Sequence, residues 1–367
     1  MSEGAAGDGY GAVAELYHAY LTGLILTAVT RRSPATAAEI VFRTFRRQHL
    51  EKFLPGLEKL GLRQLPDAVA CAQYHYLSNH LGGVRVEYMY ESDRKAWVRY
   101  VPPRWIWAGT AICAIPSEVS RAMLRAWHAH NGVSLGNPRL GFVCTAQTTD
   151  GQPGLEGYYL EHDRDLAPEE RLRFAPGEEG PPFDPARAPR VEGAGWPAER
   201  LRKIVRNYAM DYVRSMLPEL VAAVGPAEAR YLGGTAATLI GMQYYADTAA
   251  ALGVEGRGPG DFAELLRRLG AAQGDDVACA QEGGEWVVRQ RTWRLMDGVS
   301  PGDRHPAIFE AWNGLWAGAL AVHDRRLGMT VTRRLDLGDE AFEWRIRPRG
   351  NAEQRQPMES RGGARRP

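Results

Sequence analysis

The feature that most constrains the fold of this chain is a weak internal repeat that runs in the same order through both halves. Four pairs of segments match: Phe53-Leu-Pro-Gly-Leu with Met216-Leu-Pro-Glu-Leu, Gln73-Tyr with Gln243-Tyr, Trp97-Val with Trp286-Val, and Arg139-Leu-Gly-Phe-Val-Cys-Thr with Arg326-Leu-Gly-Met-Thr-Val-Thr. Their separations are 163, 170, 189 and 187 residues. The single jump of about twenty residues predicts an additional helix at 256–270 in the second half. Four matches in order predict two structurally related halves.

Each half shows the same succession of hydrophobic patterns, which predicts two helices, a β-hairpin, a further helix and a second hairpin. In the first half we expect helices at 49–60, 67–81 and 116–130, and hairpins at 84–91 with 96–101 and at 140–148 with 155–161. In the second half we expect helices at 201–224, 227–252 and 306–324, and hairpins at 277–282 with 285–293 and at 329–336 with 341–347. Helices packed on one face of an antiparallel sheet make an α+β fold. The sequence therefore predicts two tandem, related α+β domains.

Composition suggests where these domains begin and end. Residues 163–197 hold seven of the 23 prolines, interspersed with charged residues, so we expect a linker there without helix or sheet. The predicted organisation is an N-terminal tail and helix (1–39), a first repeat (40–162), the linker (163–197), a second repeat (198–348) and a disordered tail (349–367). A chain of 367 residues is long enough for two such domains.

Charge and cysteine content argue against several classes of protein. The 45 basic and 44 acidic residues are mixed along the chain without a basic stripe, so no nucleic-acid partner is expected. The longest apolar run, 16–29, is shorter than the ~18 residues of a membrane span, and residues 1–11 lack the basic start of a signal peptide. Cys71, Cys113, Cys144 and Cys279 form no C-x-x-C pair, which favours a reducing cytoplasm.

Three segments of the first half carry a family resemblance: Trp127-His-Ala-His-Asn, Gly136-Asn-Pro-Arg-Leu-Gly-Phe-Val-Cys144 and Glu161-His-Asp163. With the order of elements, they make residues 40–163 resemble the L-2-amino-thiazoline-4-carboxylate hydrolase family and its small-ligand-binding 4-vinyl-reductase-like relatives. The resemblance implies hydrolytic opening of a small sulfur- and nitrogen-containing ring that bears a carboxylate. In the second half, Asn313 and Leu315 stand where His128 and His130 would map, and Val331 replaces Cys144. We therefore expect a degenerate second copy.

Arg99 is the candidate anchor for the substrate carboxylate. A turn at 92–95 would place it on one face of the first hairpin, where its counterpart in the second half would be Val288. The other residues expected on that face are Val84, Val86, Tyr88, Tyr90, Trp97 and Val101. A guanidinium on an apolar face needs a partner. That partner is either an internal acid such as Glu87 or Glu156, or a carboxylate held bidentately. Snorkelling to the edge of the sheet is a further alternative.

The remaining candidate residues would supply the chemistry and the walls of the site. Cys113, just before a predicted helix, is a candidate nucleophile, although small buried cysteines in strands are commoner. His128 and His130 are candidate acid–base groups, or surface histidines near a helix end. Aromatic and basic walls are expected from Tyr88, Trp97, Arg104, Trp105 and Trp107.

No motif for a cofactor is present, and no ligand set has the spacing of a metal site, so neither is expected. A metal site at His128 and His130 would need a third ligand such as His75 or His80.

The sequence thus predicts a hydrolase that acts on a small carboxylated heterocycle through its first half. The alternatives are a non-catalytic small-molecule-binding protein and a metal-dependent enzyme that uses His128 and His130. The expected partner is a small-molecule substrate, and a homodimer is compatible with the sequence.

Overall fold

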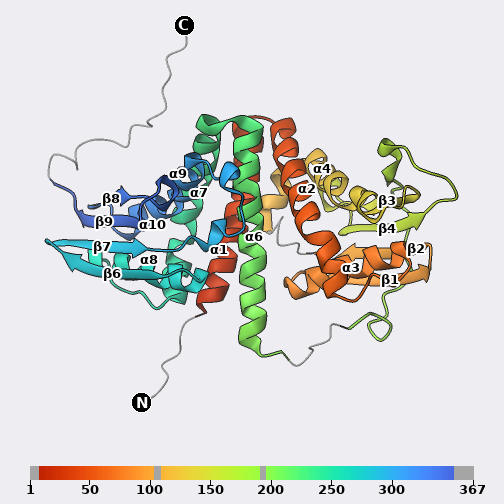
Figure 1. The fold of residues 1–367 in the computed structure, drawn as a ribbon, viewed down its shortest axis with the longest axis horizontal. Helices are drawn as coiled ribbons and strands as arrows, with labels where there is room; N and C mark the ends of the chain where they lie inside the picture. Colours follow the sequence, from red (N-terminus) through yellow and green to blue (C-terminus); the bar gives the residue numbers. More distant parts are fainter. Residues whose placement is uncertain (1–7, 103–108, 191–195, 351–367) are drawn as a thin grey trace, which may run out of the picture. The chain divides into compact units, whose positions relative to one another are not determined.

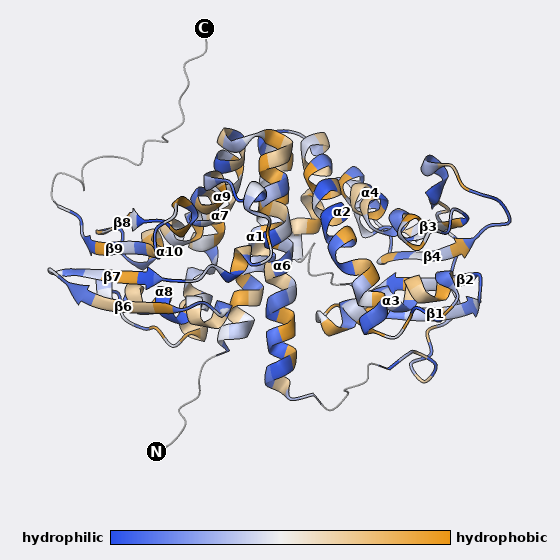
Figure 2. Cartoon of the chain, viewed as in Figure 1, coloured by the Kyte–Doolittle hydropathy of each residue, from blue (hydrophilic) through white to orange (hydrophobic). Residues whose placement is uncertain are grey.

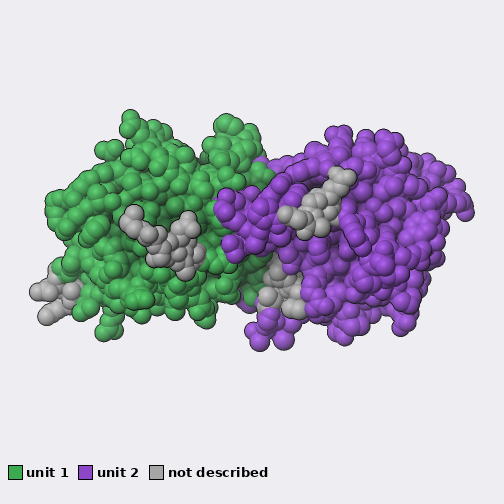
Figure 3. Space-filling view, turned by 90° about the horizontal axis from the view of Figure 1, so that it is seen from below, with its two compact units in different colours: residues 1–27, 209–367 green, residues 28–208 purple. Residues whose placement is uncertain are grey.

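The computed structural model describes residues 8–102, 109–190 and 196–350, and the predicted α+β fold is confirmed (Figure 1). The chain divides into two compact units, each with its own sheet, which Figure 3 colours separately. The first-half unit comprises residues 28–208, and the second-half unit combines residues 1–27 with 209–367. The boundaries fall inside the long helices α1 (Gly9–Arg31) and α6 (Ala198–Val224), so each helix contributes residues to both units.

The first-half unit is built on a five-stranded sheet of order β1-β2-β4-β3-β5. All neighbouring strands are antiparallel except β3 and β5. Helix α3 packs against β1, β2 and β4, whereas α2 packs on α4. The elements are α2 (Pro34–Lys59), α3 (Asp67–Leu81), β1 (Val86–Ser92), β2 (Lys95–Tyr100), η2 (Gly109–Ala114), α4 (Ser117–Ala126), η3 (His128–His130), α5 (Asn131–Leu135), β3 (Leu140–Ala146), η4 (Thr148–Asp150), β4 (Leu155–Glu161), η5 (Pro168–Arg171) and β5 (Leu172–Phe174).

The second-half unit has a four-stranded antiparallel sheet of order β6-β7-β9-β8. Helix α8 packs on this sheet, and α7 packs closely against α9 and α10. The elements are α7 (Pro226–Ala251), α8 (Pro259–Gln273), β6 (Val277–Glu282), β7 (Glu285–Gln290), η6 (Arg294–Met296), η7 (Pro301–Asp303), α9 (Pro306–Trp312), α10 (Gly314–His323), β8 (Leu327–Arg333), η8 (Leu335–Leu337) and β9 (Phe342–Pro348).

The two units share one order of elements, but the structure changes which segments correspond. Gly61 and Gly253 both end a helix with positive φ, and Gly83 and Gly274 do the same before the first strand of each sheet. Helix α2 therefore corresponds to α7, and α3 corresponds to α8. The helix predicted at 256–270 is present as α8, but the prediction that it is an additional element is wrong, because α8 is the counterpart of α3. The match of Phe53 with Met216 therefore pairs α2 with α6, and the match of Gln73 with Gln243 pairs α3 with α7, which are not equivalent helices.

Part of the predicted linker has regular structure and belongs to the first-half unit. Strand β5 pairs in parallel with β3, so the expectation that residues 163–197 form no sheet is wrong. Beyond β5, Ala175 and Phe183 pack on a buried cluster of Met89, Trp97, Val143 and Tyr158. These four side chains lie on the face of the sheet away from α3. A proline-rich chain is suited to such a cover, because it offers apolar rings without needing strand hydrogen bonds.

Helix α1 is long and apolar enough to cross a membrane by length and composition, contrary to the expectation that no segment is. Within its own unit it has the contacts of a core helix. The indole Nε1 of Trp312 donates to the hydroxyl of Tyr17 at 2.8 Å, and the hydroxyl of Tyr20 donates to the carbonyl of Gly233 at 3.2 Å. Both tyrosines are fully buried. Buried polar groups that find partners inside the protein indicate a helix of the protein core.

Candidate functional site

The hydrogen-bond register of β1 and β2 keeps Arg99 on the face of Trp97, as expected, but separates it from Tyr88. Arg99 lies opposite Glu87, and Trp97 lies opposite Met89, so these four residues share one face. Tyr88 lies opposite Val98 on the other face, towards α3. The assignment of Tyr88 and Arg99 to one face is therefore wrong.

The guanidinium of Arg99 is occupied by two internal acids. Its Nε donates to Glu156 in a very short contact, and its Nη1 donates to Glu87 at 2.9 Å. The other oxygen of Glu156 accepts from the backbone amide of Gly180 at 3.0 Å. Of the partners considered from the sequence, the structure thus places both internal carboxylates on Arg99.

The second-half unit repeats this arrangement at Arg289. Arg289 Nε donates to Glu343 at 2.7 Å, and its two terminal nitrogens donate to Glu282 at 2.6 and 2.7 Å. Glu343 pairs with Arg289 across β7 and β9, as Glu156 pairs with Arg99 across β2 and β4. The counterpart of Arg99 is therefore Arg289, and the earlier assignment to Val288 is wrong by one residue. A feature present in both units is most simply structural.

The other predicted substrate-binding and catalytic residues are not brought together. Trp97 is 2% exposed, and its indole Nε1 donates to Glu91 at 2.6 Å. Cys113 is exposed on η2, which packs beside η4, so its thiol lies outside the buried interior. Arg104, Trp105 and Trp107 lie outside the described residues.

His128 and His130 lie on a 3-10 turn rather than at the end of one long helix. Helix α4 ends at Ala126, η3 follows, and α5 begins at Asn131. The ring of His128 stacks on His75 at 4.2 Å between centroids, whereas His130 contacts His49 at 5.1 Å. The side chain of His128 therefore lies against His75, and that of His130 lies against His49, so the two do not form one site.

His128 is part of a buried polar cluster between α3, β2, β4 and α5, which we call the histidine–tyrosine cluster: His75, Tyr100, His128, Asn131 and Tyr159. The hydroxyl of Tyr100 lies 2.9 Å from His75 Nδ1 and 3.3 Å from His128 Nε2. The Asn131 amide donates to the hydroxyl of Tyr159 at 3.0 Å and lies 3.4 Å from His75 Nε2. Each of these five residues is less than 9% exposed.

Burial sets the protonation states near this cluster. Loss of solvent lowers the pKa of His75 to about 3, so this imidazole is neutral at pH 7. Burial raises the pKa of Tyr159 well above its usual value. Burial also lowers the pKa of His49 to about 2, with smaller contributions from the neighbouring His130, His75 and Arg46. Within the cluster, His75 and Tyr159 are thus neutral at pH 7.

The second-half unit shows that this fold does not require such a network. With Gly83 and Gly274 as reference points, Cys71 and His75 correspond to Phe262 and Leu266. Tyr159 corresponds to Ile346, and the stretch 128–132 corresponds to Leu-Trp-Ala-Gly-Ala at 315–319. The equivalent interior is therefore largely apolar. A buried polar cluster found in one of two related units is a candidate for a function specific to that unit.

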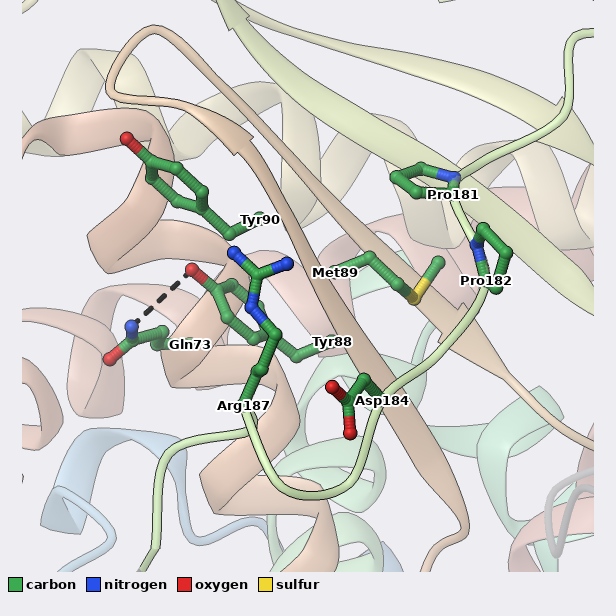
Figure 4. A pocket seen from close by; sticks show the side chains of 8 residues that line it. All are labelled: Gln73, Tyr88, Met89, Tyr90, Pro181, Pro182, Asp184 and Arg187. Atoms are coloured by element: carbon green, nitrogen blue, oxygen red, sulfur yellow. Dashed lines mark hydrogen bonds between the residues drawn. The ribbon is translucent and has the colours of Figure 1, made fainter.

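A pocket of about 280 Å³ lies at β1, between α3 and the segment 181–187 that follows β5 (Figure 4). Its lining residues are Gln73, Tyr88, Met89, Tyr90, Pro181, Pro182, Asp184 and Arg187. The Gln73 amide donates to the Tyr88 hydroxyl at 3.4 Å. Burial raises the pKa of Tyr88, which the Gln73 hydrogen bond and the charge of Arg187 partly offset. Tyr88 is thus a hydrogen-bond donor at neutral pH.

Arg187 supplies the positive charge of this pocket. Figure 4 shows its guanidinium directed back towards Tyr88 and Tyr90. Among the described residues it forms no ion pair: the carboxylate of Asp184 accepts from the backbone amide of Ala186 at 2.9 Å instead. Of the sequence candidates, Tyr88 lines this pocket. Arg187 was missed because it lies in the supposed linker, where no local pattern marks it.

No group of three or more His, Cys, Asp or Glu side chains in the described part of the chain is arranged to hold a metal ion. His75 Nδ1 and His128 Nε2 both lie within hydrogen-bonding distance of the Tyr100 hydroxyl, which takes the position that the two nitrogens share. His80 is exposed near the end of α3.

Comparison with known protein families, with curated proteins and with solved structures gave no match to this chain.

Proposed function

We propose that this chain is a small-molecule-binding protein whose first-half unit holds a compact carboxylated ligand in the pocket at β1. The observation that carries the proposal is Arg187: a guanidinium beside two tyrosines, without an ion-pair partner among the described residues. Arginine binds a carboxylate in a paired, planar contact. Tyr88 and Tyr90 offer ring faces, and Gln73 with Asp184 offers a donor and an acceptor for a polar substituent.

The pocket explains why Arg187, rather than Arg99, would meet the ligand. Arg99 already has two carboxylates, and a third would meet repulsion from both. The walls at Arg187 come from two segments distant in sequence, β1 and 181–187, which gives a compact recess of about 280 Å³. That volume is at the small end for ligand sites, so a single ring with a carboxylate is the class we propose.

The test is calorimetric titration with benzoate, with benzamide as its uncharged counterpart. Benzoate should bind and benzamide should bind at least about tenfold more weakly, because a charge-assisted pair contributes about 1.5–3 kcal/mol. Arg187→Gln should remove this preference. Arg190→Gln, an exposed arginine three residues away, is the matched control and should retain it. Equal binding of both probes, or equal loss in both variants, would exclude a carboxylate site at Arg187.

Hydrolysis of a small carboxylated heterocycle is a second candidate function, favoured by one observation. The histidine–tyrosine cluster occurs in the first-half unit, and the corresponding interior of the second-half unit is largely apolar. In this proposal His128 would move protons, and water would add to the ring carbon. Cys113 is the less suitable nucleophile because it is exposed, apart from the cluster. A reducing cytoplasm is part of both proposals, since the four cysteines are free thiols.

The hydrolysis proposal is tested by incubating the protein with 2-aminothiazoline-4-carboxylate and following its mass. Ring opening would add one water and, if the C–S bond breaks, release a thiol. His128→Gln should abolish turnover, and Cys113→Ser should leave it unchanged. If the substrate stays unaltered at high enzyme concentration while benzoate still binds, the hydrolysis proposal is excluded and the binding proposal stands.

A further inference from the structure

A second site, independent of the β1 pocket, is formed within the second-half unit where α10 ends. The turn Asp324–Arg326 leads into β8, and the loop before α8 brings Arg257 against it. Together with His323 these residues line a recess of about 380 Å³. Its lining contains three arginines and a single acid.

Arg257 is held in place by uncharged groups. Its guanidinium donates to the carbonyls of Val322 and His323 at 3.1 and 3.2 Å, and it lies 5.3 Å from the ring centre of Tyr245. These carbonyls are at the carboxyl end of α10, where the helix dipole is negative. The positive charge of Arg257 therefore offsets the negative end of the α10 dipole, which would otherwise repel an anion.

The acid of the recess is already neutralised. Arg326 contacts both oxygens of Asp324, with Nη2–Oδ2 at 2.9 Å and Nε–Oδ1 at 3.0 Å. Among the described residues, neither Arg257 nor Arg325 forms an ion pair. The recess thus keeps about two uncompensated positive charges.

A buried histidine fixes the two segments that carry these arginines. His323 is 3% exposed; its Nε2 lies 2.9 Å from the carbonyl of Gly258, next to Arg257, and its Nδ1 lies 2.7 Å from the Tyr245 hydroxyl. Because a carbonyl only accepts, Nε2 donates to Gly258, and Nδ1 makes the hydrogen bond with the Tyr245 hydroxyl. The loop before α8 is thereby tied to the end of α10.

The first-half unit has the same turn without the charges. Arg257, Arg325 and Tyr245 correspond to Leu65, Pro138 and Phe53. Arg139, the counterpart of Arg326, pairs with Glu161 at 2.7 Å. The fold can therefore form this turn without an unpaired guanidinium.

We propose that Arg257 and Arg325 bind a doubly charged oxyanion of the phosphate class in this recess. Two guanidinium groups from separate segments can contact different oxygens of one tetrahedral anion. Inorganic phosphate and a phosphate monoester share this chemistry and differ only in the group attached to one oxygen.

The experiment is calorimetric titration of the full chain with inorganic phosphate and, separately, with glycerol 3-phosphate at low ionic strength. Arg325→Gln, which changes an exposed side chain, should weaken binding at least about tenfold. Arg257→Gln should do the same, and a melting scan would show whether it remains folded. Arg139→Gln is the matched control and should bind within about twofold of the wild type. Tighter binding of one probe identifies a free or an esterified phosphate. The proposal is overturned if neither probe saturates, or if Arg139→Gln and Arg325→Gln lose equal affinity.

Discussion

Arg99 and Arg289 occupy equivalent positions in the two sheets, and each guanidinium is held by a pair of glutamates. The partners of Arg99 are Glu87 and Glu156, and those of Arg289 are Glu282 and Glu343. Glu156 and Glu343 lie directly across from their arginines in the strand pairing. Glu343 and Glu156 are both buried. Glu156 therefore depends on Arg99 for compensation of its charge, whereas Glu343 also pairs with Arg345 at 3.1 Å.

Replacing Arg99 by leucine should destabilise the protein by about 2–3 kcal/mol, because Glu156 would remain buried without its counter-charge. Arg289→Leu should have a smaller cost, because Arg345 would still pair with Glu343. Thermal and urea denaturation would measure both. Arg85→Leu, at an exposed position just before β1, is the control and should change stability by less than about 0.5 kcal/mol. An unchanged melting midpoint in Arg99→Leu would contradict the structural role.

The error over Arg99 shows what limits the prediction of a sheet from one sequence. The matched Trp97-Val and Trp286-Val segments lie in corresponding strands, β2 and β7, but they are offset by one residue. Side chains alternate between faces along a strand, so a one-residue offset exchanges the faces completely. By contrast, the match at Arg139 and Arg326 is confirmed, because Asn137 and Asp324 accept from their backbone amides in the same turn.

The candidate sites were harder to foresee than the fold. Hydrophobic periodicity indicated the strands and most helices, because burial on one face is a local pattern. The pocket at β1 combines Tyr88 with Arg187, which are nearly a hundred residues apart, and only tertiary packing brings them together. Likewise, the sequence marks His128 by its neighbours, but Tyr100, Asn131 and Tyr159 join it through the sheet.

The segment that carries Ala175 and Phe183 should be needed to keep the apolar cluster of the first-half sheet out of water. Figure 2 shows hydrophilic positions at the turn between β6 and β7, and in the second-half unit the positions of Met89, Trp97 and Tyr158 are taken by Ala280, Val287 and Arg345. Phe183→Ser should destabilise the first-half unit by about 1–3 kcal/mol and expose the cluster to solvent. Binding of a hydrophobic dye, with Phe174→Ser at an exposed phenylalanine as control, would detect the exposure.

Helices α7 and α10 approach so closely that two glycines are required. A Cβ on Gly241 would lie 2.1 Å from the carbonyl oxygen of Leu315, and one on Gly318 would lie 2.1 Å from that of Thr238. Either substitution by alanine should therefore cost about 3 kcal/mol or more, because both obstacles are backbone atoms. Gly302→Ala, where no atom lies within 4 Å, should be nearly neutral in the same melting experiment. Wild-type stability of Gly241→Ala would show that the helices are farther apart.

Acid should destabilise the first-half unit more than the second-half unit. Burial lowers the pKa of His75 to about 3, of His49 to about 2 and of His130 to about 4, whereas an unfolded chain titrates near 6.5. Below pH 6.5 the unfolded state binds more protons than the folded state, so stability falls as the pH falls.

The second-half unit contains two groups whose pKa shifts change its stability in opposite directions as the pH falls. Burial lowers the pKa of His18 to about 4, which acts in the same direction, but burial raises that of Asp275 to about 6. A carboxyl whose pKa is raised holds its proton better when folded, so between about pH 6 and 4 acidification favours the folded state there. The two effects largely offset each other.

Between pH 7 and pH 5, His75 and His49 should each cost the first-half unit about 2 kcal/mol, with a smaller contribution from half-buried His130. Hydrogen exchange with mass-spectrometric readout at both pH values, corrected for the intrinsic exchange rate, resolves the two units separately. Peptides of α3 and β4 should lose protection at pH 5, whereas those of α7 and α10 should change little. The double variant His49→Phe, His75→Phe should flatten the pH dependence in the first-half unit, whatever its absolute stability. Equal loss of protection in both units, or an unaltered slope in the double variant, would mean that these imidazoles are protonated in the folded protein.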